Sequence, residues 1–345
     1  MDITALARSL KLGDRRALAR AITLVESARA DHRAQALALL SAVGSDRQAL
    51  RIGLSGTPGV GKSTFIESFG LLLTGGTGGG GTGGGDTGHG NTGRGGKAGL
   101  RVAVLAVDPS SARTGGSILG DKTRMERLSR DPLAFIRPSP SRTHLGGVAR
   151  RTREAVALCE AAGFDVVLIE TVGVGQSETV VAHLCDIFVL LLAPAGGDEL
   201  QGVKRGIMEM ADLIIVNKAD GDLKPAALRT CADYAGALHL LRRRPQDPDG
   251  FPKAMTASAL DRTGLAQAWA EIQSLAQWRK AQAHWAANRA GQARHWFEEE
   301  VRHGLLAALT REPVKGAMRA LGDAVADGST TPEVAAAEML ALLGR

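Results

Sequence analysis

Residues 56–64 combine glycines, a lysine and hydroxyl side chains in an order that suits the binding of a polyphosphate. They are Gly56, Thr57, Pro58, Gly59, Val60, Gly61, Lys62, Ser63 and Thr64. Glycines let backbone N–H groups converge on phosphate oxygens, and the start of a helix adds partial positive charge. Lys62 is expected to reach the β- and γ-phosphates, and the Ser63 hydroxyl to hold Mg²⁺. The segment therefore predicts a site for a nucleoside triphosphate with Mg²⁺.

A second motif, Asn217-Lys218-Ala219-Asp220, follows an apolar run and predicts which base is bound. The Asp220 carboxylate can accept hydrogen bonds from both guanine N1–H and the exocyclic amine, whereas adenine offers no such pair of donors. Adenine is disfavoured because the carboxylate would be left desolvated and unpaired. A supporting loop, whose backbone would contact the guanine carbonyl, is expected at Ser258, Ala259 and Leu260. Together these residues predict GTP and GDP as the nucleotides.

Acidic residues near the ends of predicted strands are candidates for holding Mg²⁺ and organising water. Asp108 follows the apolar run 102–107, and Glu170 ends the run 166–170. Ordinary GTPases have Asp-x-x-Gly where this chain has Glu170 and Gly173, and the glycine N–H senses the γ-phosphate. Val174 stands where a water-positioning Gln is usual, so either different residues position the water or hydrolysis is slow unless a partner helps. Taken alone, Asp108 could instead cap a helix, and Asp121 could be a solvated loop carboxylate.

The elements that must position these residues alternate between short apolar runs and helical patterns. Strands are predicted at residues 51–55, 102–107, 134–137, 166–170, 187–192, 213–216 and 253–256. Continuous apolar runs are typical of parallel strands buried on both faces. The alternation predicts an α/β fold, a P-loop GTPase with a doubly wound, mostly parallel sheet.

Three regions are predicted along the chain. Residues 1–48 have helical spacing and form an N-terminal extension, and residues 49–263 form the GTPase domain. Within that domain, residues 74–99 are a glycine-dominated insert, expected to be a flexible loop with no chemistry of its own. Residues 264–345 show no strand pattern and are predicted to form a helical dimerisation or partner region. All four tryptophans lie in this last region, either as anchors between helices or on a partner surface.

Composition excludes several classes of protein. The formal charge is +6, but aromatic residues make up only 3% of the chain, so a nucleic-acid stacking platform is not expected. The three cysteines are far apart and form no C-x-x-C pair, which suits a reducing compartment. The longest apolar run, at residues 187–195, is too short to span a bilayer, and no signal peptide is recognised. The chain is predicted to be cytoplasmic, with no membrane segment.

At these residues the chain resembles the MeaB/ArgK family, the methylmalonyl-CoA mutase-associated GTPases. The matching stretches are residues 16–27, 56–64, 104–111, 115–125, 170–178, 194–202 and 217–220. The resemblance implies a homodimer with a helical N-terminal extension and a C-terminal arm. It also implies binding of GTP and Mg²⁺, slow hydrolysis, and a chaperone role toward an adenosylcobalamin-dependent acyl-CoA mutase. The chaperone would gate cofactor loading and protect or reactivate the mutase.

The resemblance also implies roles for individual residues. Lys62 and Ser63 would contact phosphate and metal, while Asp108, Asp121 and Glu170 would organise metal and water. A third switch that signals to the mutase would consist of Gly197, Asp198, Glu199, Gln201 and Lys204.

Three other functions stay open from the sequence. A nickel-insertion GTPase usually carries a His- or Cys-rich tract, and the insert holds a single histidine, His89. A kinase linked to amino-acid transport would need ATP, whereas Asp220 indicates guanine. A nucleotide-dependent scaffold would depend on the bound state rather than on turnover.

Overall fold

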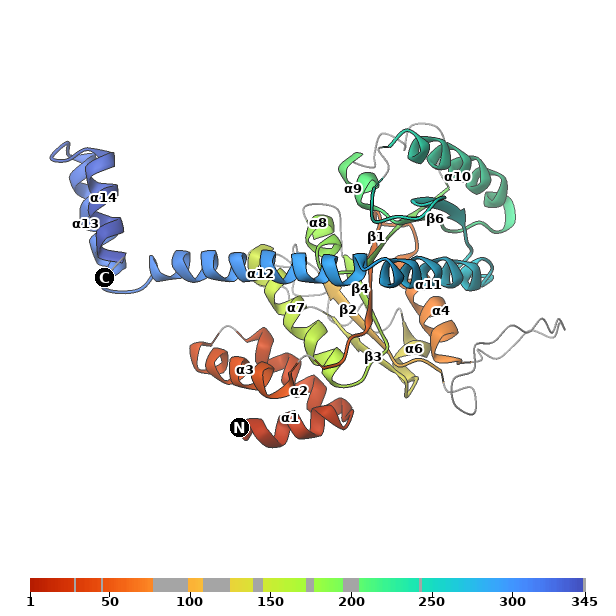
Figure 1. Ribbon diagram of the computed structural model, residues 1–345, viewed down its shortest axis with the longest axis horizontal. Helices are drawn as coiled ribbons and strands as arrows, with labels where there is room; N and C mark the ends of the chain where they lie inside the picture. The colour runs from red at the N-terminus through yellow and green to blue at the C-terminus, as the bar shows by residue number, and fades with distance from the viewer. Residues whose placement is uncertain are drawn as a thin grey trace. The chain divides into compact units, whose positions relative to one another are not determined.

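The computed structural model describes residues 1–27, 29–44, 46–76, 99–107, 125–138, 145–171, 177–194, 205–241 and 244–343. Its centre is a seven-stranded sheet in the order β3-β2-β4-β1-β5-β6-β7 (Figure 1). The strands are β1 (Leu50–Ser55), β2 (Val102–Val107), β3 (Ala134–Arg137), β4 (Val166–Thr171), β5 (Ile187–Leu192), β6 (Leu213–Val216) and β7 (Lys253–Thr256). Every neighbouring pair in the sheet is parallel. The predicted α/β fold and its strands are confirmed.

Helices cover both faces of the sheet, as β1 illustrates. Successive side chains of a strand point to opposite faces. Ile52 and Leu54 belong to the core cluster that includes Phe65 and Phe69 of helix α4 (Lys62–Thr74). At Gly53, between them, an added Cβ would lie 2.9 Å from a methyl group of Val181 in helix α8 (Ser177–Ala182). Helices α4 and α8 therefore pack on opposite faces, which makes the sheet doubly wound.

Further helices, which connect strands or follow β7, belong to the first compact unit, which runs from Met1 to Arg289. They are α6 (Glu126–Arg130), α7 (Leu145–Ala161), α9 (Arg205–Met210), α10 (Lys224–His239) and α11 (Leu265–Ala281). The parallel strands end at one edge of the sheet, where ligands collect in folds of this kind. That edge carries the loops that follow β1, β6 and β7.

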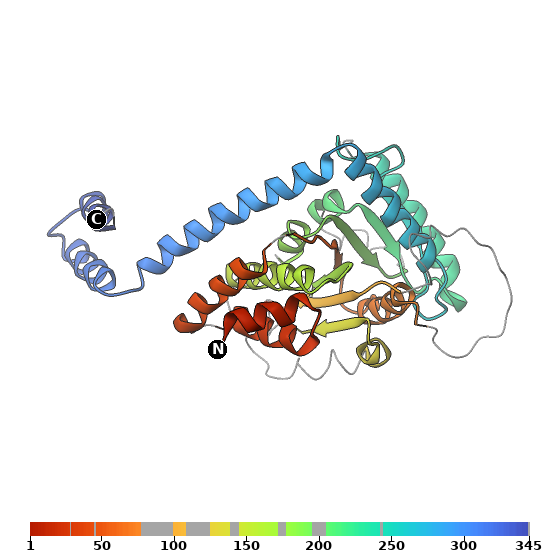
Figure 2. The same cartoon turned by 60° about the horizontal axis from the view of Figure 1, so that its bottom comes forward.

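Three N-terminal helices pack against α7 (Figure 2): α1 (Ile3–Lys11), α2 (Arg15–Glu26) and α3 (Ala30–Val43). Asp14 caps α2 by accepting hydrogen bonds from the backbone N–H groups of residues 16 and 17. Ion pairs join the extension to the sheet and its helices, from Glu26 to Arg137 and from Arg33 to Glu154. Burial raises the pKa of Glu26, and the Arg137 guanidinium opposes that rise.

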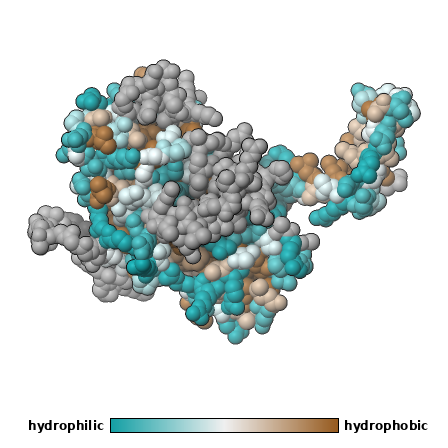
Figure 3. Space-filling model, turned by 180° about the vertical axis from the view of Figure 1, so that it is seen from behind, coloured by the Kyte–Doolittle hydropathy of each residue, from teal (hydrophilic) through white to brown (hydrophobic). Residues whose placement is uncertain are grey.

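The second compact unit runs from Ala290 to Arg345. It holds most of α12 (His284–Ala308), together with α13 (Val314–Ala326) and α14 (Pro332–Leu343). On α12, Phe297, Val301 and Leu305 recur every four residues and are 69%, 47% and 62% exposed. Hydrophobic surface is visible on this unit in Figure 3. The predicted boundaries at residues 48 and 263 stay predictions.

None of the helices in the described part of the chain is long and apolar enough to cross a membrane.

Candidate functional site

The loop at residues 56–61 links β1 to α4 and needs glycine for two separate reasons. At Gly56, a Cβ would lie 2.3 Å from the carbonyl oxygen of Leu191, so the strand and the loop approach too closely for any side chain. At Gly61, φ is +86°, a left-handed conformation that costs other residues free energy. A Cβ at Gly61 would also lie 2.9 Å from the side-chain nitrogen of Asn217. The sequence thus shapes a tight loop directly before a helix N-terminus.

Lys62 begins α4, and its side chain folds back over this loop. The Lys62 Nζ donates to the carbonyl oxygens of Gly56 at 2.5 Å and Thr57 at 3.4 Å. Burial lowers the pKa of Lys62, while the carboxylates of Glu170 and Glu178 oppose that shift. The ammonium group is therefore placed over the loop, among backbone dipoles and two negative charges.

Glu170 and Glu178 supply those negative charges from neighbouring elements. Glu170 lies in β4 and is 5% exposed, and Glu178 lies in the first turn of α8 and is 2% exposed. One residue beyond Glu170, the Thr171 hydroxyl donates to Ser55 Oγ at 3.1 Å, which joins the ends of β4 and β1. Glu170 was predicted as a site residue, whereas Glu178 was not. The only signal for Glu178 in the sequence is that it is an acidic residue shortly after a predicted strand. Its burial arises from tertiary packing, which the local sequence does not reveal.

The motif after β6 contacts the phosphate loop directly. The Asn217 side chain donates from Nδ2 to the Val60 carbonyl at 2.9 Å and accepts at Oδ1 from the Ala259 N–H at 3.1 Å. Lys218 has a φ of +58°, a left-handed conformation that fixes the turn after the strand. Asp220 accepts a hydrogen bond from the hydroxyl of Ser258. The predicted base motif and the phosphate loop therefore form one connected arrangement.

The structure brings some of the predicted residues together and leaves others undetermined. The phosphate loop, Glu170, the base motif and residues 258–260 all lie at the carboxyl edge of the sheet. Leu260 is 75% exposed and borders this region. The remaining predicted site residues fall outside the described part of the chain: Asp108, Asp121, Gly173, Gly197, Asp198, Glu199, Gln201 and Lys204.

The residues present fit a magnesium ion bound together with a nucleotide. Mg²⁺ prefers oxygen ligands and is usually held by one or two protein groups plus phosphate oxygens and water. Ser63 is the second residue of α4, and Glu170 contributes a buried carboxylate at the same edge. Within the described residues, no group of three or more His, Cys, Asp or Glu side chains could hold a metal on its own.

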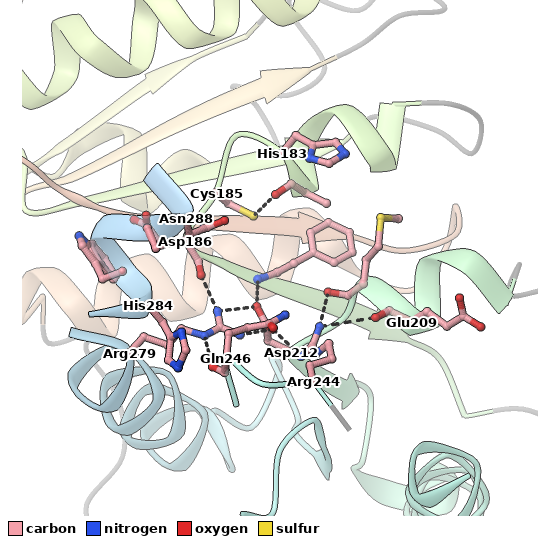
Figure 4. A pocket seen from close by; sticks show the side chains of 15 residues that line it. His183, Cys185, Asp186, Glu209, Asp212, Arg244, Gln246, Arg279, His284 and Asn288 are labelled. Atoms are coloured by element: carbon pink, nitrogen blue, oxygen red, sulfur yellow. Dashed lines mark hydrogen bonds and ion pairs between the residues drawn. The ribbon is translucent and has the colours of Figure 1, made fainter. Parts of the chain in front are cut away.

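A cavity of about 500 Å³ lies apart from these residues, at the amino-terminal edge of the sheet (Figure 4). Arg244 and Arg279 point toward Asp212 on its wall, with Nη2 to Oδ1 distances of 2.7 Å and 2.6 Å. Both arginines also pair with Asp247. Burial alone would lower the pKa of Arg279, but Asp212 and Asp247 outweigh it and raise the pKa. Since these arginines are neutralised by carboxylates, this cavity does not suit a phosphate.

This ion cluster continues toward the start of α12. Arg289 contacts Asp186 Oδ2 at 2.6 Å and Glu160 Oε1 at 3.4 Å. Glu160 also pairs with Arg51, with an Nη2 to Oε2 distance of 2.8 Å, and Arg279 donates to the Asp186 carbonyl at 2.7 Å. Among the described residues, the cluster holds four arginines and four carboxylates: Arg51, Arg244, Arg279, Arg289, Glu160, Asp186, Asp212 and Asp247.

The chain is similar to a family of GTPases, to curated relatives and to a solved structure. The family model described as "Methylmalonyl Co-A mutase-associated GTPase MeaB" matches residues 18–313. A Caulobacter vibrioides protein named "Putative GTPase" is 52% identical, with 100% of this chain and 98% of that protein covered. The Mus musculus "Methylmalonic aciduria type A homolog, mitochondrial" is 46% identical, with 87% of this chain and 69% of that protein covered. A solved structure of a LAO/AO transport system kinase is 35% identical with a TM-score of 0.71, covering 99% of this chain and 98% of that one.

Proposed function

Because this chain belongs to the MeaB family of methylmalonyl-CoA mutase-associated GTPases, we propose that it is a GTP-dependent chaperone of an adenosylcobalamin-dependent acyl-CoA mutase. The chain is a P-loop GTPase by fold and family, and this class binds guanine nucleotides. The observation that carries the proposal is the link from Asn217 to both Val60 and Ala259, which joins the phosphate loop to the base motif. That link supports a single site for both ends of GTP.

The chemistry proposed for this site is hydrolysis of the γ-phosphate. Lys62 would exchange its contacts with the Gly56 and Thr57 carbonyls for phosphate oxygens, which carry more negative charge. Ser63 and Glu170 would hold Mg²⁺, which offsets the negative charge on the phosphates when it is bound. Asp108 and Asp121 are proposed to act with Glu170 on metal and water.

Turnover is proposed to be slow until a partner binds. Val174 occupies the position where other GTPases have a water-positioning glutamine, so this chain needs another group to orient the water. The mutase is proposed to supply or order that group through the segment from Gly197 to Lys204. The name of the mouse relative, a methylmalonic aciduria type A homolog, supports a link to methylmalonyl-CoA metabolism.

A homodimer is also proposed, with α12 as part of the interface. Phe297, Val301 and Leu305 form an apolar stripe on one face of that helix. An exposed stripe of this kind is typical of a helix that packs against a partner.

The decisive experiment measures phosphate release from GTP and from ATP, with and without purified methylmalonyl-CoA mutase. We expect selective GTP hydrolysis that the mutase accelerates, and loss of activity in Lys62→Ala. Lys224→Ala, which changes an exposed lysine on α10, is the matched control. The proposal fails if the mutase alters neither GTP hydrolysis nor nucleotide affinity.

The same preparation tests the alternatives. A Lys62→Ala protein that still protects the mutase would favour a scaffold that needs no nucleotide. Tight stoichiometric Ni²⁺ binding in equilibrium dialysis would favour metal insertion. The transport-kinase alternative, which corresponds to the name of the similar solved protein, requires phosphate transfer from ATP to a protein acceptor.

A further inference from the structure

The helix that follows the phosphate loop is bonded to the loop that follows β7. The Ser68 hydroxyl on α4 donates to the carbonyl oxygen of Ala259 at 2.7 Å, across 191 positions of sequence. Ser68 lies six residues after Lys62, which places it about 9 Å along the helix axis. The contact is therefore separate from the phosphate loop itself, which leads into the start of the same helix.

This hydrogen bond closes a ring of contacts between α4, the phosphate loop, Asn217 and Ala259. Ala259 is held at its N–H by Asn217 Oδ1 and at its carbonyl by Ser68. Asn217 in turn donates to the Val60 carbonyl in the phosphate loop, and α4 leads from that loop back to Ser68. The base-side loop is thus fixed to the phosphate side at two points.

Residues 257–264, here called the base loop, are also bonded to the end of β6, where Ala257 N donates to the Val216 carbonyl at 2.9 Å, and within themselves. Ser258 N donates to the Thr263 carbonyl at 3.0 Å, and Asp261 N donates to Ser258 Oγ at 3.0 Å. Just beyond the base loop, Trp269 of α11 makes an edge contact with Phe69, the residue after Ser68, at a centroid distance of 6.1 Å. The α4 segment around Ser68 therefore contacts the base loop and the helix that follows it.

We propose that Ser68 is a positioning residue for guanine recognition, which it serves by fixing the Ala259–Leu260 peptide. The peptide bond is planar, so a fixed Ala259 carbonyl also fixes the Leu260 N–H, which points the opposite way. The Ser68 hydrogen bond holds this peptide toward α4. The hydroxyl of Ser258, in the same base loop, orients the Asp220 carboxylate. The inference rests on the proposed guanine site and adds a residue that lies outside both predicted base-reading segments, residues 217–220 and 258–260.

The test compares release of mant-GDP from the full-length wild-type protein and from Ser68→Ala, followed by stopped flow with excess GDP. Loss of one hydrogen bond should speed release by about two- to tenfold. Affinity for inorganic tripolyphosphate, which reports on the phosphate loop alone, should stay at the wild-type value. Ser68→Thr keeps the hydroxyl and should restore slow release, whereas Ser68→Cys, a weak donor of similar size, should resemble the alanine variant.

Ser129→Ala is the matched control, because the Ser129 hydroxyl donates only within its own turn, to the Glu126 carbonyl. The inference is overturned if Ser68→Ala releases mant-GDP no faster than this control. It is also overturned if tripolyphosphate binding weakens to the same extent, since Ser68 would then act on the whole domain. Failure of the wild-type protein to bind mant-GDP at all would contradict the proposed function itself, a result distinct from either of these.

Discussion

The ion cluster at the amino-terminal edge of the sheet predicts a large loss of stability when its charge balance is broken. Asp212 is 5% exposed and accepts hydrogen bonds from Arg244, Arg279 and the backbone N–H of Phe188. Asp212→Asn keeps an acceptor for the N–H but leaves four arginines facing three carboxylates. Breaking a buried ion pair in this way costs about 3–5 kcal/mol. That cost is a large share of the free energy of unfolding of a typical domain, which is roughly 5–15 kcal/mol.

The assay is equilibrium unfolding in urea, followed by far-ultraviolet circular dichroism and tryptophan fluorescence. Glu126→Gln is the control, because the Glu126–Arg130 pair is exposed and should be worth less than about 1 kcal/mol. Adding Arg279→Gln to Asp212→Asn restores equal numbers of charges, three of each sign. The double variant should therefore lose less free energy of unfolding than the sum of the two single variants.

The reasoning would be refuted by an Asp212→Asn protein that is as stable as the Glu126→Gln control. Strict additivity of the two single variants would also refute it, because the argument depends on charge balance within one cluster.

Three further predictions concern the site and the thiols. Asp220→Asn should weaken GTP binding by about 10- to 150-fold, the worth of a charged hydrogen bond, and improve XTP binding, because xanthine has a carbonyl where guanine has its amine; unchanged selectivity in a competition assay would contradict the base assignment. Glu178→Gln should slow phosphate release by about tenfold, because Lys62 loses one of the two carboxylates that oppose the lowering of its pKa; a wild-type rate would exclude a role for Glu178 in holding the charge of Lys62. Burial raises the pKa of all three thiols, but only Cys231 is not fully buried, so Ellman's reagent should label it first, ahead of Cys159 and Cys185, as peptide mapping would show.

The strands could be predicted from the sequence because buried parallel strands appear as short, continuous apolar runs. Runs such as residues 187–192 are apolar throughout and end at turn residues or acids. The structure moves only two ends by a single residue, with β1 beginning at Leu50 and β4 ending at Thr171. The phosphate loop and the base motif could be predicted for a different reason. Their chemistry depends on residues at fixed, short spacings within one segment.

The remainder of the site depends on contacts between distant segments, which no local pattern records. Glu178 and Ser68 look like ordinary polar residues of helices until α8 and α4 are packed on the sheet. The ion cluster draws its members from residue 51 to residue 289, so no window of sequence contains it. Pairing of this kind follows from strand order, which sequence periodicity does not specify.

Three strands begin in the ion cluster and end at or beside the nucleotide loops. Arg51 lies at the start of β1, and Asp186 and Asp212 directly precede β5 and β6. At their other ends, β1 leads into the phosphate loop and β6 into Asn217. These strands of four to six residues are about 13–20 Å long. In a parallel sheet they resist sliding because each is hydrogen-bonded to its neighbours along its length. A force on α12 at Arg289, which pairs with Asp186, is therefore borne by the same strands that carry the nucleotide loops.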